Sequence, residues 1–280
     1  MKQLYETKTV RKFIQHVDDP TVKTTGIPIK SRILAIGGTG SGKTHEVANF
    51  LNMSPGVFAH CVIVNMGIEE PIYEALRAKL EPKGQISFFT LDNYPTSAEL
   101  EASKENKEDQ YLVVFDDIIG SLHKKAAQGK LLDYFIAGRK RNMTSWVLAQ
   151  DFHTVPPNIR RQMSHISLLR LGSDIDLKTI LRNFNLGVTK EQLTEMYDLA
   201  TQNKFDFFKI DVGSTNPEKK FTRNFTDEFK IKAIINRKGQ KENVVLAGPW
   251  VNKMVNKRKR EEEEESNGFE EDDDEDEEEE

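Results

Sequence analysis

From Arg32 onward, short apolar runs alternate with segments in which apolar residues recur at helical spacing. The apolar runs cover residues 33–36, 61–64, 86–89, 111–115, 146–149 and 166–171. Helical spacing is found between them, over residues 44–53, 69–80, 96–106, 121–138 and 174–184. Strands that alternate with helices in this way are typical of a mostly parallel sheet with crossover helices. The pattern therefore predicts an α/β fold.

The pattern changes after residue 184. A further helix is predicted over 189–200, and two β segments at 205–212 and 221–225 read as a hairpin or an addition to the sheet edge. Residues 226–252 show no clear period, and no internal repeat is visible. We therefore divide the chain into an N-terminal arm (1–30), a main domain (31–226), a C-terminal extension (227–256) and a charged tail (257–280).

The charge is distributed unevenly. The chain has 280 residues and a formal net charge of −5. Residues 261–280 hold 16 Asp and Glu and no Lys or Arg, so 1–260 hold 40 basic and 29 acidic residues, a net charge of +11. The acidic tail cannot bury a core and is predicted to be disordered. A basic body is typical of proteins that bind polyanions, although this signal alone is weak.

No segment has the length of apolar sequence that a membrane span needs, and the first residues lack the apolar core of a secretory signal. We therefore expect no membrane association and no secretion. The lone cysteine, Cys61, has no partner for an internal disulfide and falls within an apolar run. It reads as a buried strand residue of a protein in a reducing compartment.

A phosphate-binding motif follows the first apolar run. Residues 37–44 fit G-x-x-x-x-G-K-[ST] at every fixed position, between a predicted strand and a predicted helix. In such a loop the backbone N–H groups wrap a phosphate at a helix N-terminus. We expect the lysine to reach the β- and γ-phosphates and the last threonine to bind Mg²⁺. The predicted nucleotide-binding residues are Gly37, Gly38, Thr39, Gly40, Ser41, Gly42, Lys43 and Thr44.

Two acids follow the most apolar run, residues 111–115. A run that is apolar on both faces is typical of a central parallel strand. Asp116 is placed to hold Mg²⁺, and Asp117 to polarise the attacking water, a role more often filled by Glu. The pair could instead only begin a loop or cap a helix. With the phosphate motif present, we favour the catalytic interpretation.

Two fragments resemble the motifs of guanine-binding switch proteins. Residues 117–120 resemble D-x-x-G, and residues 203–206 resemble the guanine-reading N-K-x-D. A guanine reader should follow a buried strand, whereas residues 203–206 follow a polar segment and lead into one. We therefore interpret the second match as a coincidence and expect no guanine specificity.

Further candidates lie around the run 146–149. Gln150 ends this run, where a polar sensor of the γ-phosphate or of the attacking water would lie, but it could also be an ordinary polar residue at a strand end. Upstream, Arg139 and Arg141 could reach the γ-phosphate of a neighbouring subunit. The pair at 160–161 competes for that role or for contact with DNA phosphates. A solvated surface is the plainer alternative for these charges.

Taken together, these motifs resemble the viral genome-packaging ATPases of the HerA–FtsK superfamily, as found in large DNA viruses and virophages. The resemblance covers about residues 30–226. It is carried by the segments ILAIGGTGSGKT, YLVVFDD, GRKRNMTSWVLAQD, IRRQMSHISLLRL and FDFFKIDV…KFTRNF. The first two segments would suit many ATPases. The spacing from Arg139 to Gln150 and the later segments are more specific.

This resemblance implies a RecA-like P-loop fold, ATP and Mg²⁺ as cofactors, and a homo-oligomeric ring that pumps double-stranded DNA into a capsid. It further implies that Asp116 and Asp117 are the acidic pair, Gln150 the sensor and Arg139 the finger that acts on the neighbouring subunit. The family often has Arg-His where this chain has Arg139-Lys140, so Arg141 stays an alternative. The implied partners are DNA of any sequence and a capsid or portal protein, in a virus factory, the nucleus or the virion.

A different class of function stays open, an ATP-gated scaffold that binds DNA or capsid without processive movement. Asp117 argues against it, because a pure switch needs no second acid beside the Mg²⁺ ligand. A small-molecule kinase would need an acceptor pocket or lid, for which the sequence has no signature. The basic run 257–260 could be a nuclear localisation signal or a DNA contact, and the acidic tail could compete with DNA for the basic body.

Overall fold

The computed structural model describes residues 19–67, 70–121, 125–173, 175–235 and 241–246. The charged tail and most of the N-terminal arm lie outside these ranges. The predictions of a disordered tail, a nuclear signal and competition with DNA therefore stay predictions.

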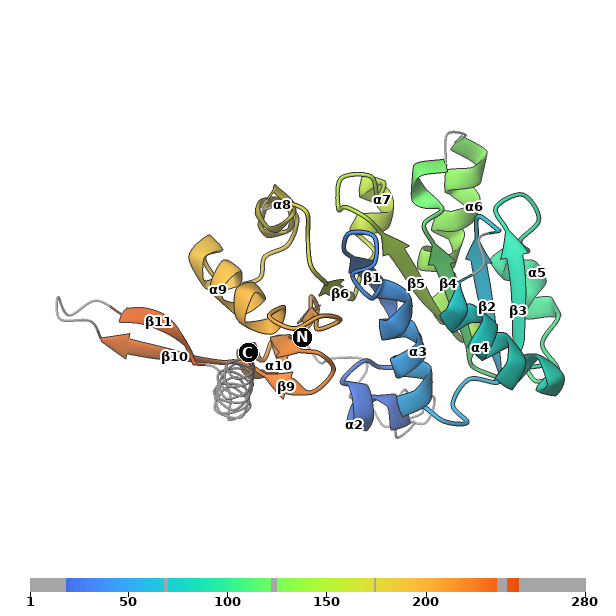
Figure 1. Cartoon of the computed structure of the whole chain (residues 1–280), viewed down its shortest axis with the longest axis horizontal. Coiled ribbons are helices and arrows are strands. Elements are labelled where there is room, and N and C mark those ends of the chain that lie inside the picture. The colour runs from blue at the N-terminus through green and yellow to red at the C-terminus, as the bar shows by residue number, and fades with distance from the viewer. Residues whose placement is uncertain (1–18, 68–69, 122–124, 174, 236–240, 247–280) are drawn as a thin grey trace, which may run out of the picture.

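A single large sheet forms the framework of the described chain (Figure 1). Its strand order is β3-β2-β4-β5-β1-β6-β7-β8-β9. The strands are β1 (Arg32–Ile36), β2 (His60–Asn65), β3 (Ile86–Thr90), β4 (Tyr111–Asp116), β5 (Met143–Ala149), β6 (His165–Leu168), β7 (Phe208–Asp211), β8 (Phe221–Arg223) and β9 (Asp227–Glu228). Strands β1 to β6 pair in parallel, and β7 to β9 add to the β6 edge in antiparallel fashion. The predicted α/β class and the edge addition are confirmed.

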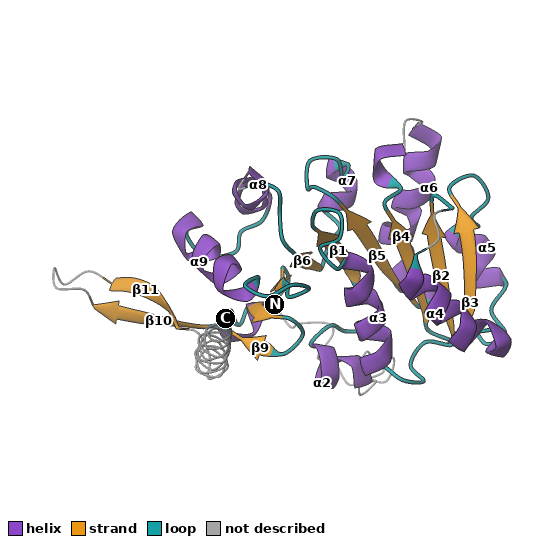
Figure 2. Cartoon of the chain, viewed as in Figure 1, coloured by secondary structure: helices purple, strands orange, loops and turns teal. Residues whose placement is uncertain are grey.

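Helices cover both faces of this sheet (Figure 2). They are α2 (Pro20–Thr25), α3 (Lys43–Met53), α4 (Pro71–Leu80), α5 (Ser97–Ala102), α6 (Lys125–Ile136), α7 (Pro157–Arg160), α8 (Ile175–Asn183), α9 (Lys190–Ala200) and α10 (Pro217–Lys220). Short 3-10 turns are η2 (Glu81–Lys83), η3 (Ile119–Ser121) and η4 (Gly138–Arg141). The long predicted helices are present. The helix expected over 96–106 ends earlier, at Ala102.

Successive residues of the central strands point to opposite faces, where they enter two separate cores. Leu34 and Ile36 of β1 pack with α5, α6 and the later helices, whereas Ile33 and Ala35 pack with α3 and α4. Every residue of β4 and β5 is buried. This double burial explains why the strands read as continuous apolar runs in the sequence.

Two features of the structure were not predicted from the sequence. Helix α2 lies in the predicted arm, where the Asp19 side chain accepts a hydrogen bond from the Thr21 amide and Pro20 opens the first turn. Strands β10 (Lys230–Ile235) and β11 (Lys241–Leu246) form a separate antiparallel pair, which projects from the β9 end of the molecule (Figure 1). Helix α2, with six residues, is too short to show a helical period in the sequence. The predicted domain limits stay predictions.

Candidate nucleotide site

The phosphate loop lies between β1 and α3, as its motif predicts. Gly40 and Gly42 have φ angles of 73° and 104°, which a side chain would strain. The loop is fixed to its neighbours, because the Gly37 amide donates to the Ala149 carbonyl over 3.1 Å and the Gly38 amide donates to the Arg170 carbonyl over 3.1 Å. Its shape is therefore set by the strands around it.

The loop offers polar groups that find no partner among the residues the structure describes. Within the described ranges, the amides of Gly42, Lys43 and Thr44 donate no hydrogen bond, and the buried Ser41 hydroxyl has no partner. Lys43 folds over the loop, where its Nζ donates to the carbonyls of Gly37 at 2.8 Å and Gly38 at 3.2 Å. Open amides at a helix N-terminus beside a lysine fit a phosphate group.

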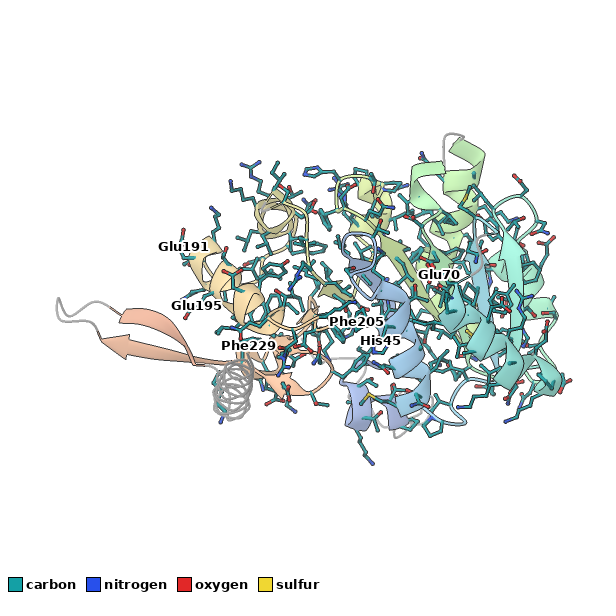
Figure 3. All side chains as sticks on the ribbon, in the orientation of Figure 1. His45, Glu70, Glu191, Glu195, Phe205 and Phe229 are labelled. Atoms are coloured by element: carbon teal, nitrogen blue, oxygen red, sulfur yellow. The ribbon has the colours of Figure 1, made fainter. Side chains whose placement is uncertain are left out.

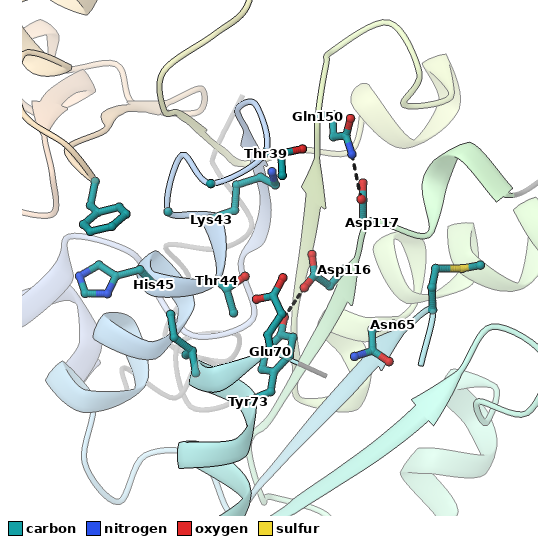
Figure 4. A pocket seen from close by; sticks show the side chains of 15 residues that line it. Thr39, Lys43, Thr44, His45, Asn65, Glu70, Tyr73, Asp116, Asp117 and Gln150 are labelled. Atoms are coloured by element: carbon teal, nitrogen blue, oxygen red, sulfur yellow. Dashed lines mark hydrogen bonds between the residues drawn. The ribbon is translucent and has the colours of Figure 1, made fainter. Parts of the chain in front are cut away.

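The acidic pair lies opposite the loop, at the end of β4 (Figure 4). Asp116 is buried and accepts a hydrogen bond of 2.6 Å from the Tyr73 hydroxyl. Burial raises the pKa of the Asp116 carboxyl to about 6, although the Tyr73 hydrogen bond acts in the other direction. Asp117 has a φ of 52° and turns to the surface. The two acids thus have different environments, one enclosed beside the loop and one open to water.

Gln150 follows β5, the strand between the phosphate-loop strand β1 and the acidic strand β4. Its Nε2 donates to Asp117 Oδ2 over 2.9 Å (Figure 4). The carboxyl ends of these parallel strands meet at one edge of the sheet, which is where α/β proteins bind ligands.

One cavity of about 260 Å³ collects these groups. It is lined by eight of the predicted site residues, Thr39, Gly40, Gly42, Lys43, Thr44, Asp116, Asp117 and Gln150. Sequence reasoning missed seven further residues that line it, His45, Asn65, Met66, Glu70, Ile72, Tyr73 and Phe205. Asn65 could have been predicted, because it directly follows the apolar run 61–64, whose strand ends at the same edge of the sheet as β4 and β5. Tyr73 and Phe205 carry no such signal, because they reach the cavity from a helix side and from a distant loop.

Arg139 and Arg141 lie elsewhere. They belong to η4, which precedes β5, so they are at the opposite end of this strand from Gln150, roughly 20 Å away for seven residues. Arg141 is engaged within its own subunit, with Nη1 at 2.9 Å from Asp133 Oδ2 and Nε at 3.0 Å from Glu101 Oε2. Arg139 is exposed and makes no ion pair within the described ranges. Neither arginine completes the cavity of its own chain.

Residues 28–212, more than half of the chain, match the family described as Poxvirus A32 protein. The chain belongs to the Poxvirus A32 protein family. This match, together with the fold, confirms the resemblance to viral packaging ATPases that the sequence suggested.

Solved structures agree on the fold of this family member. The DNA-packaging ATPase B204 from Sulfolobus Turreted Icosahedral Virus is 14% identical with a TM-score of 0.50, over 70% of this chain and 97% of that chain. The genome packaging NTPase B204 from Sulfolobus turreted icosahedral virus 2, in complex with sulfate, is 13% identical with a TM-score of 0.50, over 71% and 97% of the two chains. No curated protein matches the sequence. Among the residues with described positions, no helix could span a membrane.

Proposed function

We propose that this Poxvirus A32 family member is an Mg²⁺-dependent ATPase that translocates double-stranded DNA to package a viral genome into a capsid. The observation that carries the proposal is the single cavity in which the phosphate loop, the acidic pair and Gln150 meet. The fold supports it, because B204, which has the same fold, is a DNA-packaging ATPase.

The residues of the cavity fit the nucleotide and its metal. The Thr44 hydroxyl and the Asp116 carboxylate are the hard oxygen ligands that Mg²⁺ prefers, and they face the same space. Bound Mg²⁺ would neutralise charge on the phosphates. The Lys43 ammonium and the open amides of residues 42–44 would hold the β- and γ-phosphates.

We assign the hydrolytic role to Asp117, the exposed residue of the acidic pair. Asp117 faces water and is placed to orient a water molecule toward the γ-phosphate, and Gln150, which donates to Asp117, would hold it in position. The gain comes from positioning and charge, as in other phosphoryl transfers. A buried acid such as Asp116 could not play this part while it holds the metal.

Of the described residues that line the cavity, none is an arginine, and we propose that a neighbouring subunit of a ring supplies one. Arg141 is held by Asp133 and Glu101, so we assign the finger that acts on the neighbouring subunit to the exposed Arg139. The net charge of +11 on residues 1–260 suits a grip on DNA phosphates that does not read sequence. A capsid or portal protein is the further partner that packaging requires.

The location we propose is a reducing compartment of the host cell, a virus factory or the nucleus, with the virion as a further place. Cys61 is buried and free, and burial raises the pKa of its thiol to about 12, so it is no nucleophile.

Displacement of a third strand from a DNA triplex tests translocation directly. We expect ATP to drive displacement by the wild-type protein, and the Lys43→Ala variant to displace nothing. ATP-dependent DNA binding without displacement, under conditions where ATP is hydrolysed and capsid protein is supplied, would support the scaffold alternative instead.

A further inference from the structure

An exposed aromatic ring lies against the phosphate loop. Phe205 belongs to the loop between α9 and β7 and keeps 41% of its surface exposed. A Cβ atom on Gly42 would come within 2.6 Å of the Phe205 ring, and the ring centroids of His45 and Phe205 are 5.2 Å apart (Figure 3). Phe205 also lines the nucleotide cavity.

The backbone at Phe205 is held in an unfavourable conformation. Its φ is 70°, which is rare for an aromatic residue and persists only when the surroundings fix it. The fixing contacts come from Asp206, whose Oδ2 accepts from Arg223 Nη2 at 2.7 Å and from Asn203 Nδ2 at 2.9 Å. Asn224 Nδ2 donates to Asp206 Oδ1 at 2.9 Å. These contacts therefore hold the backbone beside Phe205 in place.

These contacts also bear on the resemblance of residues 203–206 to the guanine-reading motif N-K-x-D. In a guanine reader the aspartate of N-K-x-D must be free to accept hydrogen bonds from the base edge. Here Arg223, Asn203 and Asn224 take both oxygens of Asp206, which is largely buried. What the segment brings to the cavity is the Phe205 ring, with Lys204 Nζ over it at 4.9 Å from the ring centroid.

The residues that line the cavity follow one another in order from one end to the other. The acids Asp116 and Asp117 lie at one end, Lys43 and Thr44 follow, and His45 lies on the far side of them (Figure 4). Phe205 is the ring neighbour of His45. A nucleotide whose terminal phosphate meets the acids therefore has its base at the Phe205 end.

We propose that Phe205, with His45 beside it, is the platform on which the adenine base of the nucleotide stacks. The inference rests on the proposed nucleotide site and adds how the base is recognised, by its face and not by the edge contacts of a guanine reader. Stacking of a base on an aromatic ring is favourable for every base, so binding is tolerant of base identity.

Calorimetric titration with two Mg²⁺-loaded probes, ATP and inorganic tripolyphosphate, tests the platform. Phe205→Ala is expected to raise the Kd for ATP about 5- to 150-fold, as loss of one stacked base predicts, and to leave the Kd for tripolyphosphate unchanged. Phe205→Tyr is expected to keep wild-type affinity for both. Ile136→Ala is the matched control, since Ile136 is an exposed apolar residue of α6 outside the cavity.

Each other outcome counts against the inference in a distinct way. Equal loss for ATP and tripolyphosphate would mean that Phe205 only supports Gly42. Unchanged ATP affinity in Phe205→Ala would overturn the platform while the proposed function stands. Failure of the wild-type protein to bind either probe would overturn the nucleotide site and the platform together.

Discussion

A buried histidine makes the stability of this protein depend on pH. His165 lies in β6 with 3% of its surface exposed, between Ile33 of β1 and Asp211 of β7. Burial, and secondly the charge of Lys209, lower the pKa of the imidazole to about 3. The folded protein therefore keeps His165 neutral in mildly acidic solution, where an unfolded chain protonates it.

The size of the effect follows from this difference. Between the unfolded pKa of about 6.5 and the folded pKa of about 3, the unfolded state binds the extra proton, so the free energy of unfolding falls as the pH falls through this window. From pH 7 to pH 5 the loss is about 2 kcal/mol. This is an upper value, because Asp211 Oδ2, at 3.8 Å from His165 Nε2, would partly stabilise a protonated ring.

Urea denaturation at pH 7, 6 and 5 measures this loss. We expect His165→Phe to remove about 2 kcal/mol of the acid-induced loss of stability, whatever its stability at pH 7. His153→Gln is the matched control, because it removes an exposed imidazole. Equal slopes for His165→Phe and wild type would refute the reasoning.

Two further predictions concern the nucleotide cavity. Gly42→Ala should weaken ATP binding more than tenfold, because a Cβ at φ 104° is strained and meets Phe205 at 2.6 Å; affinity within twofold of wild type would contradict this. Arg139→Ala should lower kcat at least a hundredfold with a normal melting temperature, since Arg139 is exposed. Arg141→Ala should instead lower the free energy of unfolding by about 1 kcal/mol, because it removes partly exposed ion pairs. The reverse pattern in hydrolysis and thermal-melting assays would reassign the finger to Arg141.

The sequence predicted the parts of the fold that depend on burial. Because β1, β2, β4 and β5 are covered on both faces, each reads as an apolar run, and the order of runs and helices indicated a parallel sheet. The residues that follow these runs converge, since parallel strands end at one edge of the sheet. Asp116, Asp117 and Gln150 could therefore be placed near Lys43 without a structure.

What the sequence did not indicate depends on contacts between distant segments. Phe205 reaches the phosphate loop because Asp206 is held by Arg223 and Asn224, which are far along the chain. Tyr73, on helix α4, donates a hydrogen bond to Asp116 at the end of β4. Helix α2 is only six residues long between its N-cap Asp19 and its C-cap Gly26, so it leaves too little period to detect. Polar contacts of this kind follow no repeating pattern.

The most direct test of the central claim is steady-state ATP hydrolysis by the full chain, with and without long duplex DNA, beside the Asp117→Asn variant. We expect duplex DNA of any sequence to stimulate hydrolysis by wild type, and Asp117→Asn to bind ATP but lose the stimulated rate by a factor on the order of 10² or more. Tight ATP binding with slow hydrolysis that ignores DNA, even when capsid protein is present, would contradict the account.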